Sequence, residues 1–131
     1  MDKLEYIPGD LVTNKYYTKV LIVKKTVKNM VYTQNRDAFS DTYLSHKDDV
    51  VPMLLTPDIL EKNGWKTQNR WYYYLDVAEG LISYIGINFK HKSNKGHLYV
   101  EVDGNNMVEI QYCHELQHLL FGLGLNSEME V

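Results

Sequence analysis

The chain has 131 residues, 44% of them hydrophobic and 24% charged, with a net charge of −3 and one cysteine. This composition is typical of a globular protein and excludes a collagen, a low-complexity disordered chain and a disulfide scaffold. The length suits one domain or two very small ones, and no apolar run approaches the roughly 18 residues that cross a bilayer. The N-terminus lacks the apolar core of a signal peptide, so we expect an intracellular protein that does not enter a membrane.

Residues 1–53 are predicted to form a small SH3-like β-barrel of five short strands. A long strand is expected from Tyr16 to Val27, and its return strand from Met30 to Gln34. Lys28-Asn29 lies between them as a hairpin turn, because Asn tolerates the left-handed backbone conformation. Shorter strands are expected at 39–44 and 50–53.

Residues 54–131 are predicted to form an α+β domain of one helix, a three-stranded antiparallel meander and a C-terminal helix. Thr56-Pro57-Asp58 is a strong helix start, because Thr caps the helix, Pro suits its first position and Asp faces its positive end. Asn63-Gly64 is expected to end this helix. The alternation of apolar residues predicts strands at 71–75, 81–89 and 97–102. The fold class predicted for the whole chain is therefore α+β.

The C-terminal helix is expected from Met107 to Phe121, with Asn106 and Glu109 as a capping-box-like pair. Its apolar face is expected to cover the meander. The side chains expected on its polar side include His114, Glu115 and His118.

His114-Glu115-Leu116-Gln117-His118 matches H-E-x-x-H, the pattern of zinc metallopeptidases. Two histidines one helical turn apart bind one zinc ion, and the glutamate between them accepts a proton from the metal-bound water. A chance match has a probability of roughly one per cent in a chain of this composition. The extended pattern requires Gly at 121 and His at 124, where this chain has Phe121 and Gly124. The sequence therefore favours local hydrogen bonding by His114 and Gln117, with His118 solvated.

Two other features allow weaker interpretations. Trp71-Tyr72-Tyr73-Tyr74 is compatible with a stacking platform for single-stranded nucleic acid or sugar, but alternation along a strand leaves at most two of these rings on one face. The lysines at 24, 25 and 28 and in the loop 90–95 are the only basic clusters of an acidic chain, which is weak support for phosphate binding. Cys113 is expected to be a small core residue.

Two stretches, LTPDILEKNGW from Leu55 and YCHELQH from Tyr112, resemble a group of small uncharacterised proteins of phages, prophages and mobile elements in Bacteroides-like gut bacteria. That group has a leucine-threonine-proline helix ending in asparagine-glycine-aromatic, and a C-terminal helix with a His-x-Leu-Gln core. The resemblance covers about residues 50 to 125. It implies that His114 and Gln117 have a structural or partner-binding role, and that Glu115 and His118 occupy variable positions. The group has no established biochemical activity that the resemblance could carry over to this chain.

We therefore expect a non-enzymatic protein-interaction module of a phage or mobile element, without a cofactor, in the cytoplasm of a bacterial host cell. Aromatic grooves of small barrels bind peptides. The expected contact residues are Tyr16, Tyr17, Tyr32 and Tyr43 on the barrel, and His114, Gln117 and His118 on the helix. One alternative is a minimal zinc-dependent hydrolase, with His114 and His118 as ligands and Glu115 as base. The other is weak nucleic-acid binding.

Overall fold

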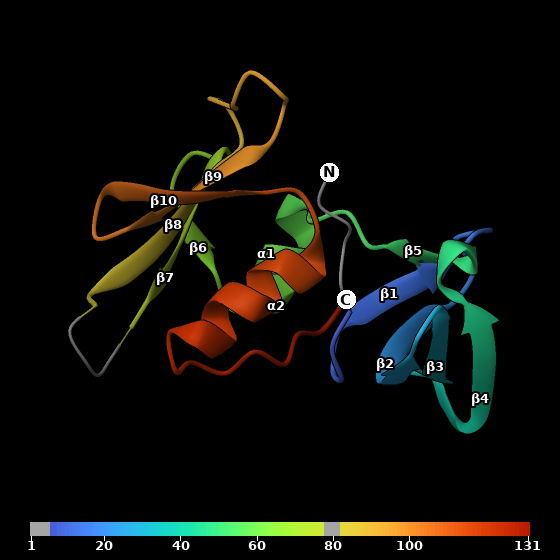
Figure 1. Ribbon diagram of the computed structural model, residues 1–131. Helices are drawn as coiled ribbons and strands as arrows, with labels where there is room; N and C mark the ends of the chain where they lie inside the picture. The colour runs from blue at the N-terminus through green and yellow to red at the C-terminus, as the bar shows by residue number, and fades with distance from the viewer. Residues whose placement is uncertain (1–5, 78–81) are drawn as a thin grey trace. The chain divides into compact units, whose positions relative to one another are not determined.

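A computed structural model describes residues 6–77 and 82–131. The chain forms two compact units, one made of Met1–Leu54 with Tyr112–Met129 and the other of Leu55–Gln111 with Glu130–Val131. Two antiparallel five-stranded sheets and two short helices make up the described part, as the predicted α+β class requires (Figure 1). The domain boundary predicted after residue 53 stays a prediction, and the first unit also includes the C-terminal helix.

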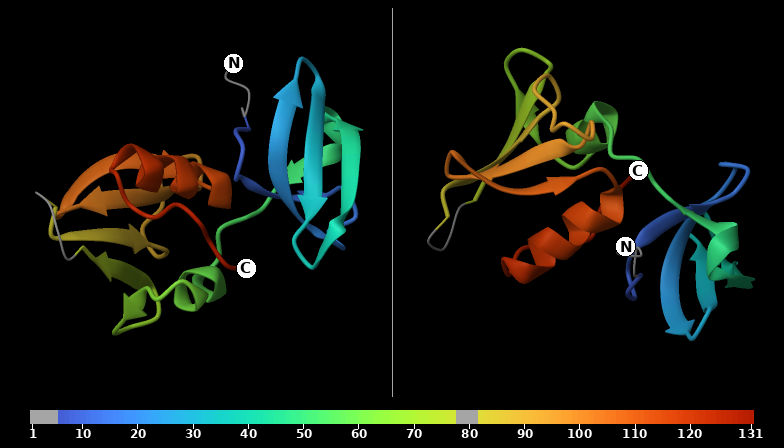
Figure 2. Two further views of the ribbon diagram at one scale, coloured as in Figure 1. Left: turned by 90° about the horizontal axis from the view of Figure 1, so that it is seen from below. Right: turned by 45° about the horizontal axis from the view of Figure 1, so that its top comes forward.

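The first unit contains a sheet with the strand order β4-β3-β2-β1-β5. Its strands are β1 (Leu11–Asn14), β2 (Val20–Val27), β3 (Met30–Asn35), β4 (Ala38–His46) and β5 (Val50–Pro52), with the 3₁₀ turn η1 (Lys47–Asp49) before β5. Figure 2 shows β2, β3 and β4 side by side, in blue to green. In the described residues the edge strands β4 and β5 do not pair with each other, so no closed barrel is found there.

One face of this sheet carries the core of the first unit. The core residues are Val12, Leu21, Val23, Val31 and Val50, with Tyr6 and Tyr43 packed against them. The hairpin places Val27 opposite Met30 and Lys25 opposite Tyr32, with a bulge between Val23 and Lys25. Because side chains alternate along a strand, Tyr32 points to the face opposite Val31. The positive φ in the hairpin turn belongs to Lys28, at 54°, where Asn29 was expected.

The strand predicted from Tyr16 begins only at Val20. The side-chain oxygen of Asn14 accepts hydrogen bonds from the backbone N–H groups of Thr18 at 2.9 Å and Lys19 at 3.2 Å. Tyr17 also has a left-handed φ of 57°. Asparagine bonded to nearby backbone in this way stabilises a loop in competition with a strand.

The first helix, α1 (Pro57–Lys62), begins and ends where the sequence predicts. The Thr56 hydroxyl accepts a hydrogen bond from the N–H of Ile59 at 3.4 Å. Beyond the helix, Gly64 has a φ of 84°, a conformation that glycine adopts at little cost.

The second unit contains a sheet with the order β10-β9-β8-β7-β6. Its strands are β6 (Lys66–Thr67), β7 (Tyr72–Asp76), β8 (Tyr84–Asn88), β9 (Leu98–Val102) and β10 (Asn105–Ile110). The three predicted strands correspond to β7, β8 and β9, although Leu81, where the second was expected to begin, lies outside the described residues. The alternation is confirmed in β8, where Ile85 and Ile87 are fully buried.

The helix predicted from Met107 is wrong at its start, because residues 105–110 form β10 and α2 covers only Cys113–Gly122. Asp103 and Gly104 both have positive φ, 52° and 89°, and form a tight turn that places Asn105 opposite Val102. The chain therefore returns as a strand. The helix begins later, where the Glu115 carboxylate accepts the N–H of Tyr112 at 2.9 Å.

Candidate functional site

The polar residues of α2 contact other parts of the first unit, to which the helix itself belongs. His114 and Gln117 are buried, with exposed fractions of 1% and 5%, although the sequence placed His114 on the polar side of the helix. His118 is partly exposed. All three contact the segment that leads into β1, residues 6–11, which we call the entry segment. The predicted helix residues are therefore brought together, but against another part of the same chain.

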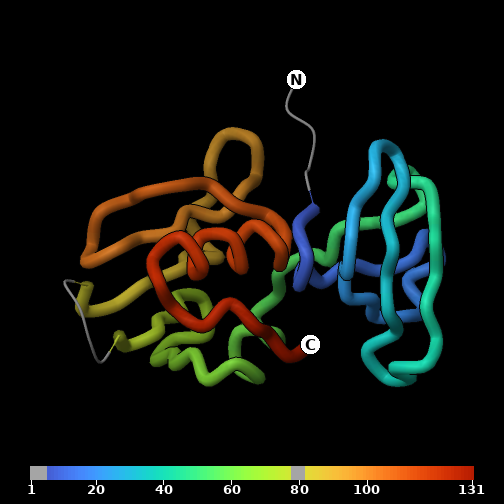
Figure 3. Tube along the Cα trace, turned by 60° about the horizontal axis from the view of Figure 1, so that its bottom comes forward, coloured from blue at the N-terminus to red at the C-terminus, as the bar shows by residue number. Residues whose placement is uncertain are grey.

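Gln117 acts as a clamp on the entry segment. Its side-chain oxygen accepts the N–H of Leu11 at 2.9 Å, and its amide nitrogen donates to the carbonyl of Gly9 at 3.0 Å. The same nitrogen donates to the carbonyl of Ser127 at 3.1 Å, where the chain turns back after α2 (Figure 3). The bond to Leu11 is buried and the other two are partly buried, so together they satisfy backbone groups away from full solvent exposure and stabilise the fold.

Asp10 and His118 form a second contact between α2 and the entry segment. The Nε2 atom of His118 lies 2.9 Å from both carboxylate oxygens of Asp10. Asp10 is 2% exposed and also accepts the N–H of Ile7 at 2.8 Å. A carboxylate this deeply buried is retained only with such partners. The expectation that His118 is simply solvated is therefore wrong.

His114 lies among aromatic rings. Its ring centroid is 5.1 Å from that of Tyr6, 6.0 Å from the stacked ring of Tyr112 and 5.6 Å from that of His118. The Nδ1 atom is buried and has no hydrogen-bond partner among residues 6–77 and 82–131. Burial lowers the pKa of His114 below its ordinary value of 6.5, and the nearby Asp10 carboxylate opposes this effect only in part.

Two of the three groups that zinc hydrolysis would need, His118 and Glu115, have other partners here. Asp10 binds the Nε2 atom of His118, and the Glu115 carboxylate accepts the N–H of Tyr112. Within residues 6–77 and 82–131, no group of three or more His, Cys, Asp or Glu side chains is placed to hold a metal ion. Burial raises the pKa of Cys113 to about 12, so its thiol is a poor nucleophile near neutral pH. The geometry makes this cluster a fold-stabilising network.

The four tyrosines predicted to form a peptide groove do not lie together. Tyr16 and Tyr17 belong to the loop before β2 and are about 70% exposed. Tyr43 lies on the core face, and its hydroxyl accepts a hydrogen bond from Lys19 at 3.1 Å. Only Tyr32 lies on the opposite, outer face of the sheet.

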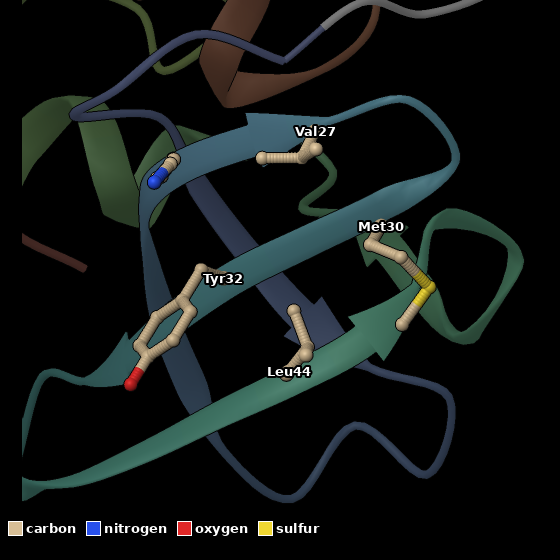
Figure 4. A pocket seen from close by; sticks show the side chains of 5 residues that line it. Val27, Met30, Tyr32 and Leu44 are labelled. Carbon is tan, nitrogen blue, oxygen red and sulfur yellow. The ribbon is translucent and has the colours of Figure 1, made fainter.

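A groove of about 310 Å³ lies on that outer face and includes Tyr32. It is lined by Lys25, Val27, Met30, Tyr32 and Leu44, and we call it the sheet groove. Figure 4 shows Val27 on β2, Met30 and Tyr32 on β3, and Leu44 on β4, with their side chains on one side of the sheet. Strand pairing brings them together, because Tyr32 is opposite both Lys25 and Leu44. Three of the four apolar side chains that line the groove are exposed, with exposed fractions of 51% for Val27, 42% for Tyr32 and 63% for Leu44.

The sequence analysis identified one lining residue of the sheet groove and missed the rest. A two-residue turn at Lys28-Asn29 already implies that Val27 faces Met30 and that both point to one side. The register of this hairpin could therefore have predicted that Val27 and Met30 line one face of the sheet. The contribution of Leu44 depends on the pairing of β3 with β4, which the local pattern does not specify.

The aromatic run in the second unit is also divided between two environments. Tyr73 is 1% exposed, and its hydroxyl donates to Glu61 at 3.0 Å, as expected of a core member. The rings of Trp71 and His91 meet edge to face, with their centroids 6.1 Å apart. The ammonium of Lys90 lies 5.3 Å from the centroid of the Trp71 ring. The nucleic-acid alternative stays untested by this geometry.

No helix among the described residues is long and apolar enough to cross a membrane. Comparison with known proteins gave no matching family, no matching curated protein and no matching solved structure.

Proposed function

We propose that this protein is a non-enzymatic interaction module that binds a protein partner through the sheet groove. The observation that carries the proposal is the exposed apolar lining, to which Val27, Tyr32 and Leu44 contribute from three adjacent strands. Single exposed apolar residues are common on protein surfaces, whereas a contiguous patch in a depression is typical of an interface. Filling the groove would remove these side chains from water.

The polar network on α2 supports this choice by elimination. His118 and Gln117, the helix residues first expected to contact a partner, bind Asp10 and the backbone of the entry segment. They would have to break buried hydrogen bonds to engage another molecule. The sheet groove requires no such exchange, because its apolar side chains face solvent.

The proposal includes the fold of the first sheet. A meander of β2, β3 and β4, with β5 returning through a 3₁₀ turn to pair with β1, supports an SH3-like arrangement of the first sheet. The origin that the sequence resemblance implies, a phage or mobile element acting in the bacterial cytoplasm, is part of the proposal as well.

The test uses random peptides displayed on phage and selected on the 131-residue chain. Selected peptides should bind the Leu44→Thr variant at least about tenfold more weakly than wild type, because an apolar anchor is lost. Phe39→Thr is the matched control, since Phe39 is on the same strand and 67% exposed but does not line the groove. Peptides that bind Leu44→Thr as tightly as wild type would overturn the proposal.

A further inference from the structure

We infer that the partner segment bound in the sheet groove is acidic as well as apolar, with a carboxylate that meets Lys25. This inference rests on the proposed function and adds the chemistry of the partner. Among the residues that the structure describes, Lys25 is the one charged residue that lines the groove. An extended segment with apolar side chains and a nearby Asp or Glu would therefore complement both the shape and the charge of this face.

The charge distribution around the groove supports an acidic partner. Residues 20–46, which form β2, β3, β4 and their connections, contain four Lys or Arg against two Asp. Arg36 is paired with Asp37 at 3.1 Å, which leaves three lysines and Asp41, and the adjoining η1 adds one lysine and two aspartates. The whole chain, in contrast, has a net charge of −3. The groove therefore lies in a locally basic part of an acidic protein, which attracts acidic segments and repels basic ones.

The strand register places the positive charge next to the apolar side chains. Lys25, Tyr32 and Leu44 are directly opposite one another on β2, β3 and β4, so they form one row across the sheet. Val27, Met30 and His46 form the next row. The Nδ1 atom of His46 lies 3.3 Å from a carboxylate oxygen of Asp48, so this histidine already has an acidic partner. Among these two rows, Lys25 is therefore the cation left for a carboxylate of the partner.

The size of the expected effect follows from exposure. Lys25 is exposed, so its attraction to a carboxylate is screened by water and salt. Replacing the lysine by glutamate converts attraction into repulsion, for which we expect about tenfold weaker binding. The loss should shrink as salt increases.

The experiment measures, by fluorescence polarisation at low and high salt, how tightly a groove-dependent peptide from the phage selection binds the 131-residue chain. We expect the selected peptides to be enriched in Asp or Glu beside apolar residues. Lys25→Glu should weaken binding about tenfold at low salt, and so should changing the acidic residue of the peptide to its amide. Lys92→Glu is the matched control, because it makes the same charge change at an exposed position of the second unit and should leave affinity unchanged.

The outcomes separate this inference from the proposed function. If Leu44→Thr abolishes binding but the peptides lack acidic residues and tolerate Lys25→Glu, the groove is a binding site and the acidic partner is wrong. If no selected peptide depends on Leu44, both proposals fail. A wild-type dimer in light scattering that becomes monomeric in Leu44→Thr would assign the groove to a second copy of the chain and overturn the inference.

Discussion

At the scale of single residues, the two buried polar residues of α2 do most to join the helix to the entry segment. Gln117 contacts three backbone groups, and its side chain is nearly inaccessible. The His-x-Leu-Gln core that the sequence resemblance emphasises thus has a structural explanation in this chain. His114 supplies a buried ring and Gln117 supplies hydrogen bonds.

Replacing Gln117 by Ala should lower the free energy of unfolding by about 1–3 kcal/mol, because the buried N–H of Leu11 would lose its acceptor and the hydrogen bond to the carbonyl of Gly9 would also be lost. Urea denaturation followed by circular dichroism measures this change. Gln68→Ala is the control, because Gln68 is exposed, and its stability should stay within about 0.5 kcal/mol of wild type. Equal losses in the two variants would contradict the clamp.

His114 predicts a pH dependence of stability. Because burial lowers its pKa in the folded state below 6.5, the unfolded chain binds a proton below that pH that the folded chain does not bind. Stability should therefore fall as pH decreases below 6.5, even though Asp10 and Glu115 nearby favour the charged form. Urea denaturation at several pH values measures it, and His114→Leu should show a smaller decrease. An unchanged slope in His114→Leu would assign the effect to other groups.

At the scale of elements, helix α1 and strands β3 and β8 follow from local sequence. Thr56-Pro57 caps a helix wherever it lies, and the alternation Ile85-Gly86-Ile87 suits a strand with one buried face. The region 105–110 was assigned wrongly because Asn106 and Glu109 fit a helix cap. This segment forms a strand because a turn with positive φ at Asp103 and Gly104 brings it beside β9, with which it pairs. Non-local pairing overrides a local propensity of this size.

Gly86 is expected to be required in β8. A Cβ atom at this position would collide with the hydroxyl of Tyr72, whose pKa is raised to about 12 by burial and by nearby Glu101. Gly86→Ala should lower the free energy of unfolding by about 1–3 kcal/mol, measured by urea denaturation. Gly122→Ala is the control, because open space surrounds Gly122 on α2.

The collision explanation has its own test. In a Tyr72→Thr background, Gly86→Ala should be less destabilising, because the ring that meets the new Cβ atom is gone. An equal loss in both backgrounds would place the cause in the backbone of β8.

At the scale of the whole molecule, the first unit combines distant parts of the chain. Leu54 pairs with Tyr112, and the N–H of Cys113 donates to the carbonyl of Met53 at 2.8 Å. A fusion of residues 1–54 to 112–129 through a short Gly-Ser linker should therefore unfold cooperatively in urea. Residues 1–53 alone should be much less stable, because Gly9 and Leu11 lose the side chain of Gln117. Equal stability of the two chains would instead support an independent domain that ends at residue 53.

The sequence by itself determined the α+β class, the helix at α1, most strand positions and the hairpin between β2 and β3. These depend on caps, turns and alternation within a few residues, which act locally. Tertiary structure alone decided that the polar residues of α2 bind the entry segment, about a hundred residues earlier in the chain. It also decided that Lys25, Tyr32 and Leu44 form one row, since bulges between Val23 and Lys25 and between Gln34 and Asn35 shift the register of the two hairpins. The physical reasons differ: hydrogen bonds between segments far apart in sequence leave no local periodicity from which they can be predicted, and a bulge changes the pairing of a hairpin without changing its apolar alternation.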